Sequence, residues 1–185
     1  MKNHTINAGF PVLVCTSQKK ISIFHIFNTS GMKTIHQWLS EYGESHQNKT
    51  NKLIHWICVP AIFFSITGLL YAVKLPWSVQ GIQINLALLA MLGLTLYYLG
   101  LSKTIWIGML LFGCLCLLGA NWLERNGPLP LWAYCLIIFG LAWIGQFYGH
   151  HVEGKKPSFL KDLQFLLIGP AWLMSYIYRK LGMGM

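Results

Sequence analysis

The sequence is poor in charged residues, and acidic residues are especially rare. Only 10% of its 185 residues are charged, with 5 acids against 14 lysines and arginines. An ordinary soluble domain has about a quarter of its residues charged. Hydrophobic residues reach 55% of the chain. One domain of this length cannot hide so much apolar surface from water, so the composition argues against a soluble globule and indicates a membrane protein.

Four long windows contain no Asp, Glu, Lys or Arg. Each is close to the roughly 20 apolar residues that a helix needs to cross the hydrocarbon core of a bilayer. We therefore predict four spanning helices, over Leu53–Val73, Ile82–Leu101, Thr104–Leu123 and Leu129–Gly149. Pro60 lies inside the first window, which predicts a kink there.

Two further segments flank these windows. Apolar residues recur at helical spacing at Ile35, Trp38, Leu39 and Tyr42, which predicts an amphipathic helix on the membrane or beneath the bundle. Leu163–Tyr178 is shorter, and the sequence leaves open whether it is re-entrant, interfacial or a fifth span. The predicted fold class is therefore all-α: an integral membrane bundle of four spanning helices, a preceding amphipathic helix and a short C-terminal fifth membrane segment.

The surplus of basic residues does not indicate nucleic-acid binding. The lysines flank the apolar windows and form no basic helix face, and neither finger spacing nor an aromatic RNA-binding motif is present. With four spans, one side of the membrane carries Lys33, Lys49, Lys52, Lys103, Lys155, Lys156 and Lys161. Only Lys74 and Arg125 lie on the other side. The positive-inside rule makes the first side cytoplasmic.

Histidines lie where the apolar windows meet water. The first window begins near His55 and the last ends near His150, and an even number of crossings returns both to the same side. His46 precedes the first window on that side, and His151 and Glu153 follow the last. His150 and Glu153 are three residues apart and share a helix face, whereas His151 points about 100° away. We expect this set to meet at one end of the bundle.

Several imidazoles beside a carboxylate suit a divalent transition metal. Two histidines and one carboxylate with open positions favour non-haem Fe(II) oxygen chemistry, although imidazole also binds Zn(II). The alternative is that each interfacial histidine is only an amphipathic or capping residue. Lys155 and Lys156, which follow the cluster, either set the membrane orientation or attract the anionic head group of a lipid.

Two stretches around these histidines resemble a known family. Residues 41–60 read EYGESHQNKTNKLIHWICVP and contain H-x-x-x-x-N-x-x-x-H-x-x-x-x-P. Residues 146–159 read QFYGHHVEGKKPSF and contain G-H-x-x-E-x-x-x-P. As a pair, these stretches resemble the two hallmark blocks of the Mpo-like membrane proteins, which are 2-hydroxy fatty acid dioxygenases. The similarity extends from about Met32 to Tyr178.

The resemblance implies an Fe(II)-dependent membrane enzyme that uses O₂ to shorten a 2-hydroxy fatty acid by one carbon in fatty acid α-oxidation. It places His46, His55 and His150 at the catalytic metal site. Glu153 falls within the second block and is expected as a further metal ligand. The other expected partner is membrane lipid, with no nucleic acid, and the sequence leaves open whether the protein is a homo-oligomer.

The remaining expected site residues surround these ligands. Asn51 lies one turn before His55 and is expected to orient it, and His151 is expected beside the metal rather than on it. Lys155 and Lys156 are expected to neutralise the substrate carboxylate. The fatty acid's alkyl chain is expected to lie along the bundle, where burial stabilises it by about 0.8 kcal/mol per CH₂.

The sequence divides into a leader or tail over residues 1–31, a membrane-embedded catalytic domain over 32–181 and a C-terminal tail over 182–185. We expect a multi-pass protein of a bacterial inner membrane or an endoplasmic reticulum membrane, with the site on the cytoplasmic side. Two other functions remain open at this stage. One is a zinc-dependent membrane lipid hydrolase, and the other is a non-enzymatic lipid-binding membrane protein.

Overall fold

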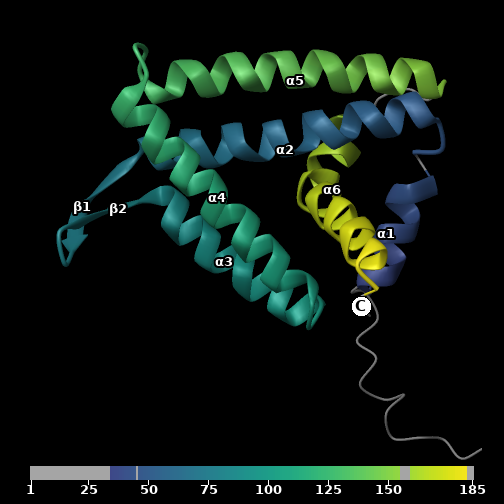
Figure 1. Cartoon of the computed structure of the whole chain (residues 1–185), viewed down its shortest axis with the longest axis horizontal. Coiled ribbons are helices and arrows are strands. Elements are labelled where there is room, and N and C mark those ends of the chain that lie inside the picture. Colours follow the sequence, from purple (N-terminus) through teal and green to yellow (C-terminus); the bar gives the residue numbers. More distant parts are fainter. Residues whose placement is uncertain (1–33, 45, 155–158, 183–185) are drawn as a thin grey trace, which may run out of the picture. The chain divides into compact units, whose positions relative to one another are not determined.

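The computed structural model describes residues 34–44, 46–154 and 159–182. These residues belong to one unit, and their helices are joined by short connections and one two-stranded hairpin (Figure 1). In chain order the elements are α1 (Ile35–Glu44), α2 (Lys49–Ala72), β1 (Lys74–Val79), β2 (Ile82–Asn85), α3 (Leu86–Leu101), α4 (Ile105–Asn126), α5 (Leu131–Glu153) and α6 (Phe159–Lys180). The predicted helical class is confirmed. The predicted leader over residues 1–31 lies outside the described residues.

Within the described part of the chain, three helices are long and apolar enough to cross a membrane: α2, α4 and α5, with 24, 22 and 23 residues. They correspond to the first, third and fourth predicted spans. Helix α3 is equally apolar but has only 16 residues, so the fourth crossing stays a prediction. Large apolar side chains such as Leu115, Leu118 and Leu141 are about two-thirds exposed, as expected for helix faces that contact lipid.

The hairpin corrects one predicted boundary. Residues Ile82–Asn85 were expected to begin a spanning helix, but they pair as β2 with β1, with Val79 opposite Ile82. Gln80 and Gly81 both have positive φ, 49° and 78°, which is the geometry of a tight two-residue hairpin turn. The side chain of Asn85 then accepts a hydrogen bond from Leu88 N, so α3 begins after Asn85.

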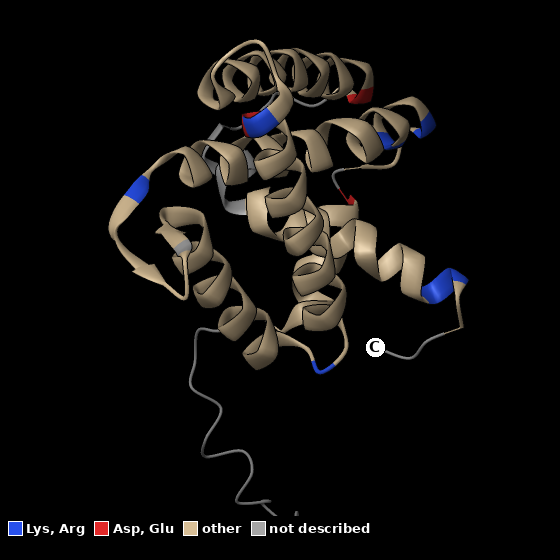
Figure 2. Cartoon of the chain, turned by 60° about the vertical axis from the view of Figure 1, so that its left-hand side comes forward, with Lys and Arg blue, Asp and Glu red and all other residues tan. Residues whose placement is uncertain are grey.

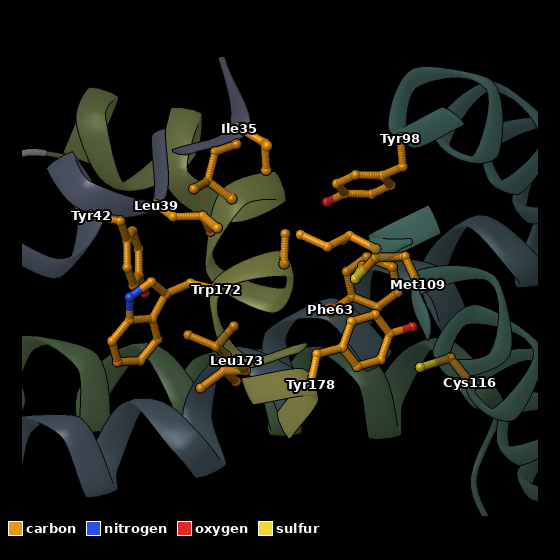
Figure 3. Close-up of a cluster of buried hydrophobic side chains, with 14 of the residues drawn as sticks. Ile35, Leu39, Tyr42, Phe63, Tyr98, Met109, Cys116, Trp172, Leu173 and Tyr178 are labelled. Atoms are coloured by element: carbon orange, nitrogen blue, oxygen red, sulfur yellow. The ribbon is translucent and has the colours of Figure 1, made fainter. Parts of the chain in front are cut away.

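Helices α1 and α6 pack together and complete the core. The predicted amphipathic helix is confirmed, since Ile35, Leu39 and Tyr42 of α1 are buried. Figure 3 shows these side chains near Trp172 and Leu173 of α6 in one apolar cluster. The predicted fifth membrane segment is helical throughout, from Phe159, and it is not among the helices long and apolar enough to span.

Helices α2 and α5 lie side by side over most of their length (Figure 1). Glycines allow this close approach, because a Cβ at Gly145 would overlap Cys58 Sγ and one at Gly68 would overlap Cys135 Sγ. Small residues are the usual means by which membrane helices pack tightly. The N-terminal end of α2 therefore lies beside the C-terminal end of α5, where the candidate site is built.

Charged residues lie at the ends of helices and in connections rather than along the helices (Figure 2). Lys49 and Lys52 lie in the first turn of α2, and Arg179 and Lys180 in the last turn of α6. At the opposite end of α2, Lys74 forms a 3.0 Å salt bridge with Glu124. This distribution leaves the middle of each helix free of charge, as lipid requires.

Candidate metal centre

The structure brings together three histidines from three separate segments. His46 lies between α1 and α2, His55 lies in the second turn of α2, and His150 lies in the last turn of α5. Their ring centroids are 4.2 Å (His46–His55), 5.3 Å (His55–His150) and 5.8 Å (His46–His150) apart. One nitrogen of each ring lies within 4.8 Å of the others. All three side chains are buried, with 2%, 2% and 8% of their surface exposed.

The break between α1 and α2 makes this convergence geometrically feasible. His46 and His55 would point in opposite directions on one straight helix. Asn48 instead caps α2, because its side chain accepts hydrogen bonds from Thr50 N and Asn51 N, and the chain turns before it. The turn therefore places His46 beside the second turn of α2 rather than on its far side.

Main-chain carbonyls fix the tautomers of two of the rings. His46 Nδ1 lies 2.6 Å from Tyr42 O, and His55 Nδ1 lies 2.9 Å from Asn51 O. A carbonyl oxygen only accepts hydrogen bonds, so each Nδ1 must carry the proton. Nε2 of each neutral ring then holds the lone pair that can bind a metal, as in most protein metal sites.

Aromatic rings hold the His46 imidazole in place. Tyr42 stacks on it, with 4.2 Å between ring centroids and 16° between ring planes. Trp172 of α6 approaches the same imidazole, with centroids 6.2 Å apart. The residues that pack α1 onto α6 therefore also orient the candidate ligand.

Glu153 lies beside the three histidines but is not brought together with them. One carboxylate oxygen accepts a 2.8 Å hydrogen bond from Gln47 N, and the other accepts from Asn48 N at 3.0 Å and Asn51 Nδ2 at 2.9 Å. The three-histidine group does not include this carboxylate. Its hydrogen bonds instead tie the end of α5 to the start of α2.

Asn51 connects Glu153 to His55. Its side-chain amide donates to Glu153 and its main-chain carbonyl accepts from His55. Asn51 is fully buried, and its Oδ1 lies against Gly149 of α5, where a Cβ would overlap it. Sequence reasoning missed Gly149, although the Gly-His pair at 149–150 is part of the quoted motif.

The other predicted residues are placed apart from the cluster or lie outside the described part. His151 is exposed beside buried His150, in agreement with the 100° offset between neighbours on a helix. Gly154 ends α5 in a left-handed conformation, with a φ of 72°. Lys155 and Lys156 follow it and fall outside the described residues.

The histidines line a small cavity of about 40 Å³. Val59 and Ile62 of α2 and Phe165 and Leu166 of α6 supply apolar walls. Gln146, one turn before His150, is buried and also lines the cavity. Sequence reasoning missed Gln146, and its signal was a lone amide within an otherwise apolar window.

Three buried nitrogen donors fit a first-row divalent metal. Imidazole binds Fe(II), Zn(II) and other such ions, and the positions that the three histidines leave open can take exchangeable ligands. The donor set is neutral and enclosed by apolar side chains. The site can therefore hold a metal in surroundings of low water content.

A second feature near the cluster is a basic groove of about 680 Å³ between α2 and α6. Its cationic side chains come from the first turn of α2 and the last turn of α6: Lys49, Lys52, Arg179 and Lys180. Trp56 and Trp172 line its apolar side, and Trp172 also faces His46. The sequence could not reveal this groove, because its two halves are more than a hundred residues apart.

Comparison with known proteins finds a matching family and a related yeast protein. The family described as "2-hydroxy-palmitic acid dioxygenase Mpo1-like" matches residues 32–181. The 2-hydroxy-palmitic acid dioxygenase MPO1 of Saccharomyces cerevisiae is 31% identical over 154 residues, which cover 82% of this chain and 84% of the yeast protein. No solved structure matches the chain. The two histidine blocks and the helices that carry them lie within the matched residues, and the chain belongs to the 2-hydroxy-palmitic acid dioxygenase Mpo1-like family.

Proposed function

We propose that this protein is an Fe(II)-dependent membrane dioxygenase that shortens 2-hydroxy fatty acids by one carbon with O₂. The observation that carries the proposal is the buried group of His46, His55 and His150. The name of the yeast relative supplies the substrate class, a 2-hydroxy fatty acid, and the reaction type.

The three histidines would hold the iron through nitrogen donors. Tyr42 O and Asn51 O hold a proton on Nδ1 of His46 and His55, which leaves Nε2 of each ring to face the metal. A bound ferrous ion would supply the oxygen chemistry, as it does in non-haem iron oxygenases with open positions.

The surrounding residues position these ligands and exclude water. Glu153 holds the start of α2 against the end of α5, so His55 and His150 keep a fixed separation. Val59, Ile62 and Phe165 close the cavity with apolar surface, which favours an alkyl chain over water next to the reacting carbon.

The substrate carboxylate needs a cationic partner. We assign this role to Lys155 and Lys156 from the sequence, because both lie within the second motif, five and six residues after His150. Lys74 begins β1, beyond the far end of α2, and Arg125 lies in the last turn of α4, so neither is assigned to the site. We also place the site on the cytoplasmic side, because most flanking lysines would share its side of the membrane.

The test is turnover of a defined substrate. The full-length protein, purified in detergent and supplied with Fe(II), should convert 2-hydroxypalmitate and O₂ into pentadecanoic acid, CO₂ and water, with the shorter acid detected by mass spectrometry. His55→Ala should abolish the product, whereas His36→Ala, an exposed residue of α1, should retain it. Absence of the shorter acid in the wild-type protein, or its retention in His55→Ala, would overturn the proposal.

A second candidate is a zinc-dependent lipid hydrolase. It is favoured by one observation: the group contains three histidines and no carboxylate, as in some catalytic zinc sites. The two candidates differ in their requirements, because the hydrolase would contain zinc and would consume no O₂.

A further inference from the structure

An apolar cavity of about 380 Å³ lies between α2, α3 and α6. Ligand pockets of small molecules typically measure about 300–1,000 Å³ and are mostly apolar. Phe63, Thr67 and Leu70 of α2 face Ala87 and Gly93 of α3 across it. Among the residues that the structure describes, no charged side chain lines it. The cavity therefore has the size and chemistry of a binding site for an alkyl chain.

This apolar cavity adjoins the histidine cavity. Leu166 of α6 lines both of them. Ile62 lines the histidine cavity and its neighbour Phe63 lines the apolar one, so the two cavities also lie at neighbouring positions along α2. A molecule with its polar head at the histidines would have to pass Leu166 to place its tail in the apolar cavity.

The cavity extends away from the metal centre along α2. Leu70, at its far end, follows His55 by about four helical turns, or roughly 22 Å at 1.5 Å per residue. Leu86 N donates to Val73 O, so the start of α3 lies beside the end of α2. Tyr98, near the other end of α3, donates to Leu167 O. Helix α3 thus runs from the far end of the cavity toward the histidines.

We propose that this cavity holds the alkyl chain of the 2-hydroxy fatty acid, and that α3 at Gly93 sets the chain length the enzyme accepts. The inference rests on the proposed function and adds to it the location of the tail. Burial of each further methylene stabilises the complex only while the cavity has room for it. The side chains that close the cavity therefore limit the length of the alkyl chain that it can bury.

Two glycines of α3 provide a matched pair of variants. Gly93 lines the cavity and Gly100 does not, and a Cβ at either position meets no atom within 4 Å. Both substitutions replace a helical glycine with the same residue, so their effects on the helix itself should be alike. Only Gly93→Phe directs a ring into the proposed tail site.

Chain-length preference is measured as the ratio of kcat/KM for 2-hydroxypalmitate to that for 2-hydroxylaurate. Gly93→Phe should lower this ratio by about tenfold or more, because a pocket one or more methylenes shorter discriminates on that scale. Gly100→Phe should keep the wild-type ratio. Equal ratios in the two variants would overturn the assignment of the tail site.

A second measurement does not require turnover. A 2-hydroxy fatty acid with a diazirine at its methyl end is bound to the wild-type protein without iron, irradiated and mapped by mass spectrometry. Labelling should fall on residues 63–70 and 87–97 and should be suppressed by excess 2-hydroxypalmitate. Labelling of the groove at Trp56, or labelling spread over lipid-facing residues, would overturn the inference. Specific labelling of these residues by a protein that shows no turnover would support the tail site and contradict the proposed reaction.

Discussion

At the scale of single residues, hydrogen bonds and ring stacking hold two of the three candidate ligands, His46 and His55. The carbonyls of Tyr42 and Asn51 fix the protons of His46 and His55, and Tyr42 also stacks on His46. Asn51 contributes through both its carbonyl and its side-chain amide. The orientation of the His46 and His55 imidazoles is therefore established by the fold before any metal binds.

Gly149 provides the sharpest test of this packing. In Gly149→Ala the added methyl would overlap Asn51 Oδ1, so we expect a loss of about 1–3 kcal/mol of stability. Gly140→Ala lies in the same helix, and its methyl would meet no atom within 4 Å, so it should be neutral or slightly stabilising. Thermal unfolding in detergent measures both. Equal melting temperatures for the two variants would mean that the contact between α5 and Asn51 is looser than described.

At the scale of helices and loops, Glu153 joins the end of α5 to the start of α2 by hydrogen bonds. Its carboxylate accepts two main-chain hydrogen bonds and one from Asn51, across more than a hundred residues of sequence. The sequence motif suggested a metal ligand at this position. A residue that joins the two helices and a residue that binds the metal differ in the expected effect of the same substitution.

In Glu153→Gln we expect the protein to lose stability, by about 1–3 kcal/mol, because the new amide N–H groups face existing donors. Metal affinity should fall by about 10–100-fold, as is usual when a residue that orients the ligands is changed. At saturating Fe(II) the variant should still bind one ion per chain, as measured by elemental analysis after desalting. Complete loss of bound iron in a variant that remains folded would instead indicate direct ligation.

The helices were predictable because their windows exclude charge over the length of a membrane crossing. The convergence of His46, His55 and His150 also followed from the sequence, through the even number of predicted crossings. The hairpin at Gln80–Gly81 was not predicted, because β2 contains no charged residue and was counted as the start of the apolar window that follows it, although its residues alternate between apolar and polar as in a strand. The role of Gly149 and the hydrogen bonds of Glu153 depend on which faces of α2 and α5 meet, and periodicity in one helix does not determine that.

At the scale of the whole molecule, four membrane crossings would place His46, His55 and His150 on the same side of the bilayer. Helices α2, α4 and α5 are long and apolar enough to cross the membrane. Helix α3 would have to cross with only 16 residues. A shorter apolar helix can cross where flanking side chains extend to the interface or the bilayer thins locally. The two ends of α3 would then lie on opposite sides of the membrane, and so would the two ends of α4.

Cysteine accessibility tests this topology. In a variant lacking the native cysteines, Lys49→Cys and Lys103→Cys should react with a membrane-impermeant maleimide from the cytoplasmic side. Gly81→Cys and Asn126→Cys should react only from the other side. Labelling of Lys103→Cys and Asn126→Cys from the same side would show that α4 does not cross, and the histidines would no longer be explained by an even number of spans.

The central claim is that His46, His55 and His150 bind one iron ion. Its most direct test is X-ray absorption at the iron edge on the purified full-length protein, together with elemental analysis. The account predicts one iron per chain whose spectrum contains scattering from three imidazole rings, and a reduced imidazole contribution in His150→Ala. A protein without stoichiometric iron, or iron whose spectrum lacks imidazole scattering, would contradict the account.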